Sequence, residues 1–365
     1  MAVFKSIIAF FKTVIVFFMS FTQLMLPGIQ KTVNGGESAF FEQWSPEQAY
    51  TENYAAELAK ETGKDFVILN LTDIQMGDIE SFDAAGDLAF GTIKKLVEET
   101  DPDLITLTGD NAWATYAYIK LVKEIDSYGI PWAPVMGNHD GQGCPSEYWC
   151  ASQFASAKNC LFKFGPEGMG YGNYIINITE NGQIIHTLYM MDTHSSADDT
   201  EEGAALNGTG YDGFWSSQFK WYEWAVKGNA ALAGKNVEST IFVHIPLYEY
   251  NNAWNMAYDQ EAGAYRDEFA ATSFGVNHEG ICSPNKNNGF FDLLKELDST
   301  KTVIAGHDHV NCSSIVYEGV RLSYGLKCGS GCYWESEMSG GTTVSINSDG
   351  AATVQHIYVD PASVN

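Results

Sequence analysis

Basic residues are scarce in this chain, and arginine is almost absent. Lysine and arginine together number 20 against 46 aspartates and glutamates, the formal net charge is −26, and the only arginines are Arg266 and Arg321. A field of this sign repels the phosphates of nucleic acids and anionic membrane surfaces, so neither is an expected partner. We attribute the acidity mainly to solubility. It does not exclude a small phosphorylated substrate, because the charge of a bound metal ion dominates its own surroundings.

The sequence also lacks internal repeats, low-complexity tracts and paired cysteine motifs. Its seven cysteines include no two pairs at zinc-finger spacing, which argues against a structural zinc site. Their number fits an oxidising compartment, although the pairing stays open and the odd count leaves at least one thiol unpaired or intermolecular. Hydrophobic residues make up 45% and aromatic residues 13% of the 365 residues, enough for a substantial core in one large α/β domain or two small ones.

Residues 1–30 have the pattern of a targeting segment. Lys5 and Lys12 precede a mostly apolar stretch, residues 13–26, which ends at Pro27 and Gly28. We expect a signal peptide or an N-terminal anchor, and the pattern favours the cleaved signal, since a full span needs about 20 apolar residues. The sequence thus predicts a secreted or cell-surface protein whose only membrane attachment is through this segment.

Residues 31–64 are expected to form a lead-in with an N-terminal helix over 45–60, followed by a single domain over 65–360. Apolar runs at 66–71, 104–107 and 130–136 predict buried strands, and the segments 83–100 and 114–127 between them predict helices. This βαβαβ order indicates parallel strands joined by crossover helices.

The second half of the chain is richer in strands. An Asn-Gly pair at Asn181 predicts a hairpin of strands 174–178 and 184–190. Other expected elements are a surface loop over 193–213 that leaves Asn207 open to glycosylation, a helix over 216–232 with core-facing Phe219, Tyr222 and Trp224, an irregular excursion over 249–288, a short helix over 290–297, and a hairpin of a second sheet from strands 342–346 and 353–358.

Five strand-like runs end in side chains that can bind metals. Because open α/β sheets bind ligands at the carboxyl ends of their strands, we expect these side chains to meet at one edge. The five endings are Asp73-Ile74-Gln75, Gly109-Asp110, Gly137-Asn138-His139-Asp140, His244 and Gly306-His307-Asp308-His309. Such a mixture of oxygen and nitrogen donors suits a pair of transition-metal ions, with Asp110 as the natural bridge. Two ions roughly 3.5–4 Å apart generate hydroxide and hold the oxygens of a displacement at phosphorus.

In their order, these motifs resemble the signature of the calcineurin-like metallophosphoesterase family, over about residues 65–335. The segments 244–250, 288–291 and 307–311 are similar to its purple acid phosphatase-related branch in particular. The resemblance implies an α/β sandwich of two mixed β-sheets flanked by helices, with a dinuclear metal site at the carboxyl ends of the strands. It also implies two metal ions drawn from Fe, Mn, Zn or Mg.

The resemblance assigns a role to each motif residue. The first metal would be held by Asp73, Asp110 and His309, and the second by Asp110, Asn138, His244 and His307. His139 would donate to the phosphate or protonate the leaving group, with Asp140 orienting its imidazole. Asp308, between two ligand histidines, is expected to lie behind the ligands or face solvent.

One position departs from the family pattern. Gln75 stands where the family usually has a histidine ligand of the first metal, and Trp113 stands where purple acid phosphatases have a metal-binding tyrosine. Either the amide oxygen of Gln75 or a water would fill the gap. His194 and the pair His278-Glu279 are further candidates to face the site, whereas His186 and His356 are expected to be ordinary structural residues.

The sequence therefore predicts a phosphohydrolase that cleaves phosphate monoesters by attack of a metal-bound hydroxide on phosphorus. A phosphodiesterase of the same family is one alternative. A catalytically weak or inactive phosphate-binding relative is the other, because Gln75 replaces the usual histidine. The presence of His139 and of every second-metal ligand favours the enzyme.

Overall fold

The computed structural model describes residues 40–77 and 84–364. The predicted targeting segment, residues 1–30, and the first part of the lead-in lie outside these ranges. Within the two ranges, none of the helices has the length and apolar character that crossing a membrane requires.

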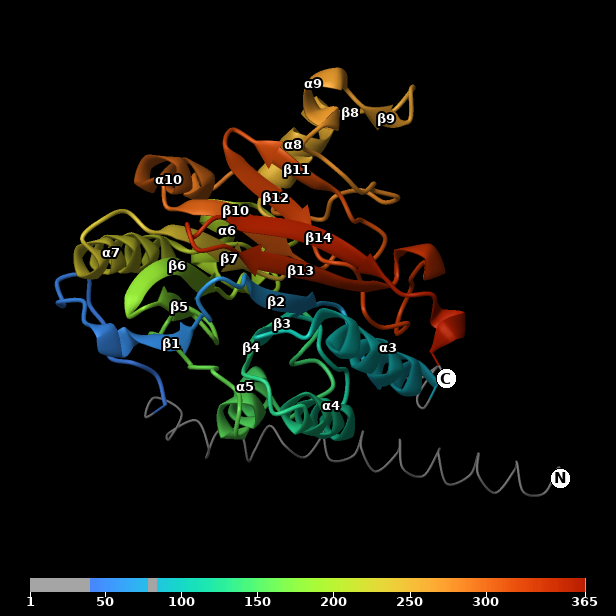
Figure 1. Cartoon of the computed structure of the whole chain (residues 1–365), viewed down its shortest axis with the longest axis horizontal. Coiled ribbons are helices and arrows are strands. Elements are labelled where there is room, and N and C mark those ends of the chain that lie inside the picture. Colours follow the sequence, from blue (N-terminus) through green and yellow to red (C-terminus); the bar gives the residue numbers. More distant parts are fainter. Residues whose placement is uncertain (1–39, 78–83, 365) are drawn as a thin grey trace, which may run out of the picture.

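Two large β-sheets lie face to face and form the centre of the molecule (Figure 1). One has five strands in the order β14-β13-β2-β3-β4, and the other has seven in the order β1-β5-β6-β7-β10-β12-β11. The strands are β1 Ala55–Ala59, β2 Phe66–Leu71, β3 Leu104–Thr108, β4 Trp132–Val135, β5 Tyr174–Glu180, β6 Gln183–Met190, β7 Glu238–Phe242, β10 Thr300–Ala305, β11 Ser314–Tyr317, β12 Val320–Tyr324, β13 Gly340–Ile346 and β14 Ala352–Tyr358, with a separate small pair β8 Tyr258–Asp259 and β9 Ala264–Tyr265.

Helices cover the outer face of each sheet (Figure 1). The α-helices are α3 Ala84–Thr100, α4 Thr115–Ser127, α5 Glu147–Ser156, α6 Glu201–Asn207, α7 Ser216–Ala233, α8 Glu249–Ala257, α9 Asp267–Ala270 and α10 Phe290–Leu297. Short 3-10 turns are η2 Glu52–Tyr54, η3 Ala197–Asp199, η4 Ser336–Met338 and η5 Pro361–Ser363. Helices α3 to α5 belong to the five-stranded sheet, and α7, α8 and α10 to the seven-stranded sheet.

Strands of the seven-stranded sheet are buried on both faces. In β7, Phe242 joins the core between the two sheets, and its neighbour Ile241 joins the core under α7 and α10. In β10, Ile304 joins the core between the sheets, and its neighbour Val303 joins the core under α7 and α10. Burial on both faces accounts for the continuous apolar runs in the sequence, because successive side chains of a strand point to opposite faces. The predicted two-sheet sandwich is confirmed.

The helix predicted over residues 45–60 is wrong, because most of this segment is irregular and its end is a strand. After the turn η2, β1 pairs in parallel with β5 at the edge of the sheet. Ala56 and Leu58 pack on the core between the sheets, and Ala55 packs on the opposite face. Pairing with β5 thus overrides the helix preference of an Ala- and Glu-rich segment.

Three further predictions are corrected by the structure. The final hairpin belongs to the same sheet as β2 to β4, because β13 pairs with β2. The predicted loop over 193–213 contains η3 and α6. Asn207 is buried and its amide donates to Asp212 at 2.6 Å, so it is not open to glycosylation. All seven cysteines lie in the described ranges, and none of them forms a disulfide bond there.

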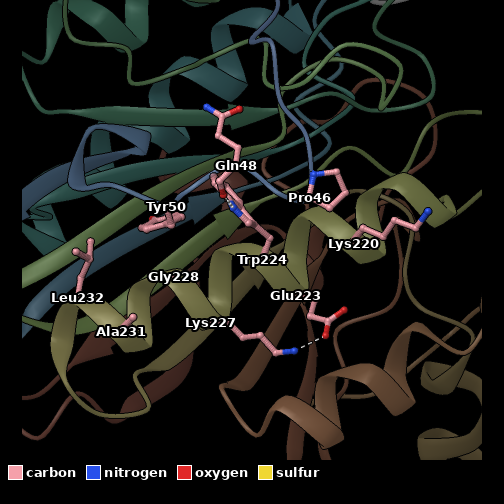
Figure 2. Close-up of a pocket in the computed structure, with 10 residues that line it drawn as sticks. All are labelled: Pro46, Gln48, Tyr50, Lys220, Glu223, Trp224, Lys227, Gly228, Ala231 and Leu232. Carbon is pink, nitrogen blue, oxygen red and sulfur yellow. Dashed lines mark hydrogen bonds and ion pairs between the residues drawn. The ribbon is translucent and has the colours of Figure 1, made fainter.

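A groove of about 520 Å³ runs between the lead-in and α7 (Figure 2). Tyr50 and Trp224 form its aromatic wall, with ring centroids 4.8 Å apart. Trp224 and Phe219 are partly buried and Tyr222 is fully buried, which confirms the aromatic face predicted for this helix. None of the residues that line the groove is a predicted metal ligand.

Candidate metal centre

The predicted ligands come from both sheets and meet at one rim of the sandwich. Strands β2, β3 and β4 are parallel and deliver Asp73, Asp110 and Asn138 at their carboxyl ends. Strands β7 and β10 are also parallel and deliver the histidines 244, 307 and 309 from the other sheet. The carboxyl ends of the two sets of strands face each other, as the sequence predicted.

His244 and Asp110 form the middle of the group. His244 Nε2 lies 3.3 Å from Asp110 Oδ1, 2.9 Å from Asn138 Oδ1 and 3.3 Å from His307 Nδ1. The opposite ring nitrogen, Nδ1, donates to the carbonyl oxygen of Thr108 at 2.8 Å. This bond fixes Nδ1 as a donor and directs Nε2 toward Asp110, the orientation that a metal-binding imidazole requires.

Asp73 and His309 make a similar arrangement beside it. His309 Nδ1 donates to the carbonyl of Tyr333 at 3.0 Å, and its Nε2 lies 3.4 Å from Asp73 Oδ1. Asp73 Oδ2 accepts hydrogen bonds from the Thr72 hydroxyl at 2.7 Å and from the His307 amide at 2.9 Å. One oxygen of Asp73 is therefore fixed by the protein, and the other faces His309.

Two atoms of this group are buried without a hydrogen-bond partner. They are Asp73 Oδ1 and His307 Nε2. Buried polar atoms are rarely left unpaired, because each costs about 1–3 kcal/mol. Donor atoms of Asp73, Asp110 and His244 also lie within 4.8 Å of one another. The donors are carboxylate oxygens and imidazole nitrogens, so the residues present fit a site for divalent ions.

Electrostatics keep both carboxylates ionised. Burial opposes the charge of Asp73, but the neighbouring His309 ring and the positive charges of His244 and Lys327 outweigh burial and hold its pKa well below the usual range. Burial opposes the charge of Asp110 as well, and His244 outweighs it, which lowers the pKa of Asp110 to about 2. Ionised carboxylates are the form that binds cations.

The backbone is strained where the ligands leave their strands. Asp73, Gln75, Asp110 and His307 have φ of 50°, 46°, 48° and 79°, and they are four of the ten non-glycine residues with positive φ in the described ranges. Such conformations persist only where the surrounding structure enforces them, and they gather at functional sites. Close packing supports the strain, since a Cβ on Gly306 would lie 2.0 Å from Thr72 Oγ1.

Gln75 is oriented differently from the expectation that its amide oxygen ligates the first metal. Its Oε1 accepts from Lys327 Nζ at 2.8 Å, and its Nε2 donates to Asp110 Oδ2 at 3.0 Å. Lys327 is buried and also donates to the carbonyl of Asp73 at 2.7 Å. Burial lowers the pKa of Lys327 to about 8, although Asp73 and Asp110 favour its charged form. The Lys327 ammonium is therefore hydrogen-bonded to the Gln75 amide oxygen, which was expected to bind the first metal.

Asp140 does not orient His139, so its predicted catalytic role is wrong. Its buried carboxylate accepts from the Gly137 amide at 2.7 Å and from both the backbone and side-chain amides of Asn111 at 2.8 Å. These bonds tie the turn after β4 to the turn after β3. Its pKa is raised to about 6 by burial and by Asp110. Asp140 is thus a positioning residue for the loops that carry the ligands.

His139 lies at the partly exposed edge of the group. Its backbone amide donates to Asp110 Oδ1 at 2.9 Å, and its Nδ1 lies 2.8 Å from Gln142 Oε1. The imidazole stacks on Trp113, with ring centroids 4.5 Å apart and an interplanar angle of 19°. Trp113 and Gln142 thus hold the ring in the way that was predicted for Asp140.

Aromatic rings also flank two of the ligand histidines. Tyr333 stacks on His309 at 4.2 Å, and Tyr211 meets His307 edge to face at 4.3 Å. Sequence reasoning missed these tyrosines, because nothing in the motifs points to them. It also missed Lys327, although Lys327 follows an apolar strand and a glycine in the same pattern as the ligands.

The secondary candidates have mostly structural partners. His194 lines a cavity of about 150 Å³ that reaches Gly137, but its ring stacks on Trp215 and its Nε2 bonds to Gln218. His278 pairs with Glu335 at 2.7 Å, and Glu279 accepts from the Val310 amide. His186 and His356 are buried and each is hydrogen-bonded to a backbone carbonyl, of Gly350 and of Cys312, so both are structural residues as predicted.

Comparison with known proteins agrees with this geometry. The family model for calcineurin-like phosphoesterases matches residues 66–311, which include every predicted ligand. The chain belongs to this family.

Individual relatives match a somewhat smaller part of the chain. A protein of Arabidopsis thaliana named probable inactive purple acid phosphatase 14 is 27% identical over 64% of this chain and 60% of its own length. Phosphatase DCR2 of Saccharomyces cerevisiae is 31% identical over 60% of this chain and 38% of its own.

These phosphoesterase relatives are longer than the matched region, and this chain spans about three fifths of the plant protein and less than two fifths of the yeast protein. Among solved structures, a dimetal phosphatase from Danio rerio superposes with a TM-score of 0.51 at 13% identity, covering 77% of this chain and 95% of that chain. At this level of identity the likeness concerns the fold. It agrees with the two-sheet sandwich described above.

Proposed function

We propose that this protein hydrolyses phosphate monoesters with the help of two bound metal ions. The observation that carries the proposal is the convergence of six potential ligands from two sheets, among which Asp73 Oδ1 is buried without a partner. When bound, two such ions lower the pKa of water and neutralise charge on phosphate oxygens. The names of the yeast and zebrafish relatives, both called phosphatases, support a monoester substrate.

The ligand groups would divide between the two ions. Asp73 lies against His309, whereas Asp110, Asn138 and His307 gather around His244. Asp110 would be shared. Its Oδ1 already lies close to His244, and its Oδ2 is held by Gln75, so its position does not depend on the ions.

His139 would exchange a proton with the leaving group. Its Nδ1 lies 2.8 Å from Gln142 Oε1, an oxygen that can only accept, so Nδ1 carries a proton. Nε2 is then the nitrogen that can reach a substrate oxygen. The stack on Trp113 fixes the plane of the ring. General acids of this kind contribute typically about 10²–10⁴-fold to the rate.

The test combines metal content with hydrolysis. The purified full chain is assayed for bound metals and for turnover of an aryl phosphate monoester and the matching diester. We expect metal-dependent hydrolysis with preference for the monoester. A preference for the diester would make the protein a phosphodiesterase, and full metal loading with no turnover of either substrate would contradict the proposal.

A catalytically weak phosphate-binding protein is the second candidate. The contact between Gln75 and Lys327 favours it, because the ammonium occupies the amide oxygen and places a cation beside the first metal position. The plant relative is also named as probably inactive. This candidate predicts that inorganic phosphate binds to the metal-loaded protein with measurable affinity while turnover stays absent.

A location outside the cell or on its surface is part of the proposal, and the apolar segment over residues 13–26 supports it. Expression of the full chain, followed by fractionation and determination of the mature N-terminus, tests it. Recovery of the intact, uncleaved chain in the soluble cell fraction would contradict it.

A further inference from the structure

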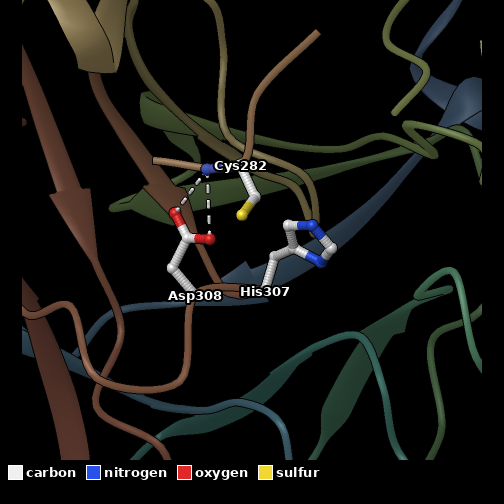
Figure 3. A group of neighbouring side chains, drawn as sticks. All are labelled: Cys282, His307 and Asp308. Atoms are coloured by element: carbon white, nitrogen blue, oxygen red, sulfur yellow. Dashed lines mark hydrogen bonds between the residues drawn. The ribbon is translucent and has the colours of Figure 1, made fainter. Parts of the chain in front are cut away.

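A second group of metal-binding side chains lies against the candidate centre. It consists of Cys282, from the segment between α9 and α10, and of His307 and Asp308, which follow β10. One donor atom from each lies within 4.8 Å of the other two. In Figure 3 the sulfur of Cys282 points toward the His307 ring, and the Asp308 carboxylate lies against the Cys282 amide.

His307 belongs to both groups because its two ring nitrogens have different surroundings. Nδ1 lies 3.3 Å from His244 Nε2, at the candidate metal centre. Nε2 is buried and has no hydrogen-bond partner, and the residue as a whole is only 7% exposed. A buried nitrogen without a partner indicates that a ligand is needed there.

The other two side chains are held ready by the protein. Both oxygens of Asp308 accept from the Cys282 amide at 3.2 Å, and one accepts from the Tyr324 hydroxyl at 2.5 Å. A carboxylate has about four acceptor positions, so Asp308 keeps free lone pairs. Cys282 is only partly buried, so its sulfur can be reached from solvent.

Oxidation sensing is not the function that this thiol suits. Burial, together with the charge of Asp308, raises the pKa of Cys282 to about 12, so the thiol is protonated and unreactive at neutral pH. A thiophilic cation, by contrast, binds sulfur strongly enough to displace that proton into solvent.

We propose that Cys282, His307 and Asp308 form a third cation site, selective for thiophilic divalent ions such as Zn²⁺ or Cd²⁺. Sulfur, imidazole and carboxylate together are a donor set typical of zinc, with a fourth position open to water. Hard ions such as Mg²⁺ do not favour a sulfur ligand. The site would therefore distinguish thiophilic ions from a hard activating ion.

Occupancy of this site has a consequence for the neighbouring centre. A neutral imidazole has a single lone pair in its ring plane, so binding through Nε2 leaves the proton on Nδ1. His307 then cannot also ligate an ion beside His244. The third site and the catalytic centre thus compete for one residue, and thiophilic ions should inhibit hydrolysis. The inhibition rests on the proposed function, whereas the binding site does not.

The binding test uses cadmium alone as the probe. The full chain, loaded with Mn²⁺, is titrated with Cd²⁺ while the ultraviolet charge-transfer band of cadmium thiolate is recorded. Wild type should show a band that saturates at one equivalent, and Cys282→Ser should lose it. Cys332→Ser is the matched control, because Cys332 is the exposed thiol and should leave the band unchanged. No band in wild type, or an equal band in Cys282→Ser, would overturn the proposal.

The inhibition test uses hydrolysis of the aryl phosphate. Cys282→Ser should need at least about tenfold more Cd²⁺ than wild type for half inhibition, since loss of a ligand or its support costs about 10–100-fold in affinity. Added Mn²⁺ should relieve inhibition of wild type. A cadmium band without inhibition would overturn the sharing of His307. Because the band needs no turnover, an inactive protein would contradict only the hydrolytic proposal.

Discussion

At the residue scale, the candidate centre combines ligands fixed by the backbone with one buried cation that the family pattern does not predict. Two of the histidines donate from Nδ1 to carbonyl oxygens, of Thr108 and of Tyr333, which leaves each Nε2 directed inward. Lys327 adds a positive charge behind Asp73 and holds Gln75 with its amide nitrogen toward Asp110. We therefore expect an ion held by Asp73 and His309 to bind weakly, because Lys327 adds a repelling charge and Gln75 does not supply a ligand oxygen.

Substitution of His139 should separate catalysis from metal binding. His139→Ala should lower kcat by about 10²–10⁴-fold, the usual contribution of a general acid, while metal content stays near that of wild type. Asp110→Ala is the contrasting variant, because it removes the shared carboxylate and should abolish both metal binding and activity. Metal analysis alongside steady-state kinetics decides the matter. If His139→Ala lost its metals as fully as Asp110→Ala, then His139 would be a ligand.

Removal of the Lys327 charge should strengthen metal binding. Lys327→Met deletes a cation beside two ionised carboxylates and releases the Gln75 amide, so divalent ions should bind at least about tenfold more tightly. The loss of two buried hydrogen bonds should lower the free energy of unfolding by roughly 1–3 kcal/mol. Calorimetric titration with Mn²⁺ measures the first effect.

Lys60→Met is the matched control for that experiment. Lys60 has a fully buried side chain and pairs with Glu180 at 2.7 Å, but it touches none of the predicted ligands. Lys60→Met should lower the free energy of unfolding but should leave the affinity for metal ions unchanged. Equal metal affinity in Lys327→Met and wild type would show that the ammonium does not affect the centre.

At the scale of elements, the strands and helices that were predicted correctly are those whose own residues determine their structure. Strands β2, β3 and β4 are buried on both faces, so each is a continuous apolar run, and the ligands follow directly where the runs end. Strand β1 was missed because it forms by pairing with the distant strand β5, and the residues of β1 alone do not predict this pairing. The sheet that receives β13 depends likewise on β2, far away in the chain.

The same distinction applies within the candidate site. The ligand types were visible at strand ends, whereas the contact of Gln75 with Lys327 joins residues at opposite ends of the domain. The partner of Asp140 could not be read from its position next to His139, because the carboxylate turns inward to the amides of Gly137 and Asn111. Sequence thus predicted which residues gather, and the structure was needed to show what orients them.

The junction of β10 with its ligand loop depends on Gly306. A Cβ there would lie 2.0 Å from Thr72 Oγ1 and 2.8 Å from Asp73 Oδ2. Gly306→Ala should therefore lower the free energy of unfolding by about 1–3 kcal/mol and weaken metal binding, because Asp73 must move. Gly280→Ala is the control, since the added methyl would meet no atom within 4 Å beyond its own chain neighbours. Urea denaturation and metal titration check both effects, and equal behaviour of the two variants would refute this role of Gly306.

At the scale of the whole molecule, two buried histidines connect stability to pH. His186 lies in the seven-stranded sheet and His356 in the five-stranded sheet, and burial lowers the pKa of each from 6.5 to about 4. The folded protein therefore keeps these rings neutral over a range in which the unfolded chain takes up protons. Their contribution is fully present above pH 6.5 and is lost as the pH falls toward 4.

Substitution of His186 should reduce this pH dependence. Each histidine contributes up to about 3 kcal/mol to the loss of unfolding free energy on acidification. His186→Gln can keep both hydrogen bonds, to Gly350 and Thr240, without titrating. Between pH 7 and pH 4.5 this variant should lose less stability than wild type in urea denaturation. An identical loss in both proteins would mean that His186 does not titrate on unfolding.

The ligands that meet at the rim belong to different sheets, and this has a mechanical consequence. Asp73, Asp110 and Asn138 extend from the five-stranded sheet, and His244, His307 and His309 extend from the seven-stranded sheet. An ion bound by both sets would connect the two sheets at this rim of the sandwich. Because an ion that binds only the folded state stabilises it by mass action, its removal with a chelator should loosen this end first. Amide hydrogen exchange would register the opening along the ends of β2, β3, β7 and β10, while the far end of the sandwich stays closed.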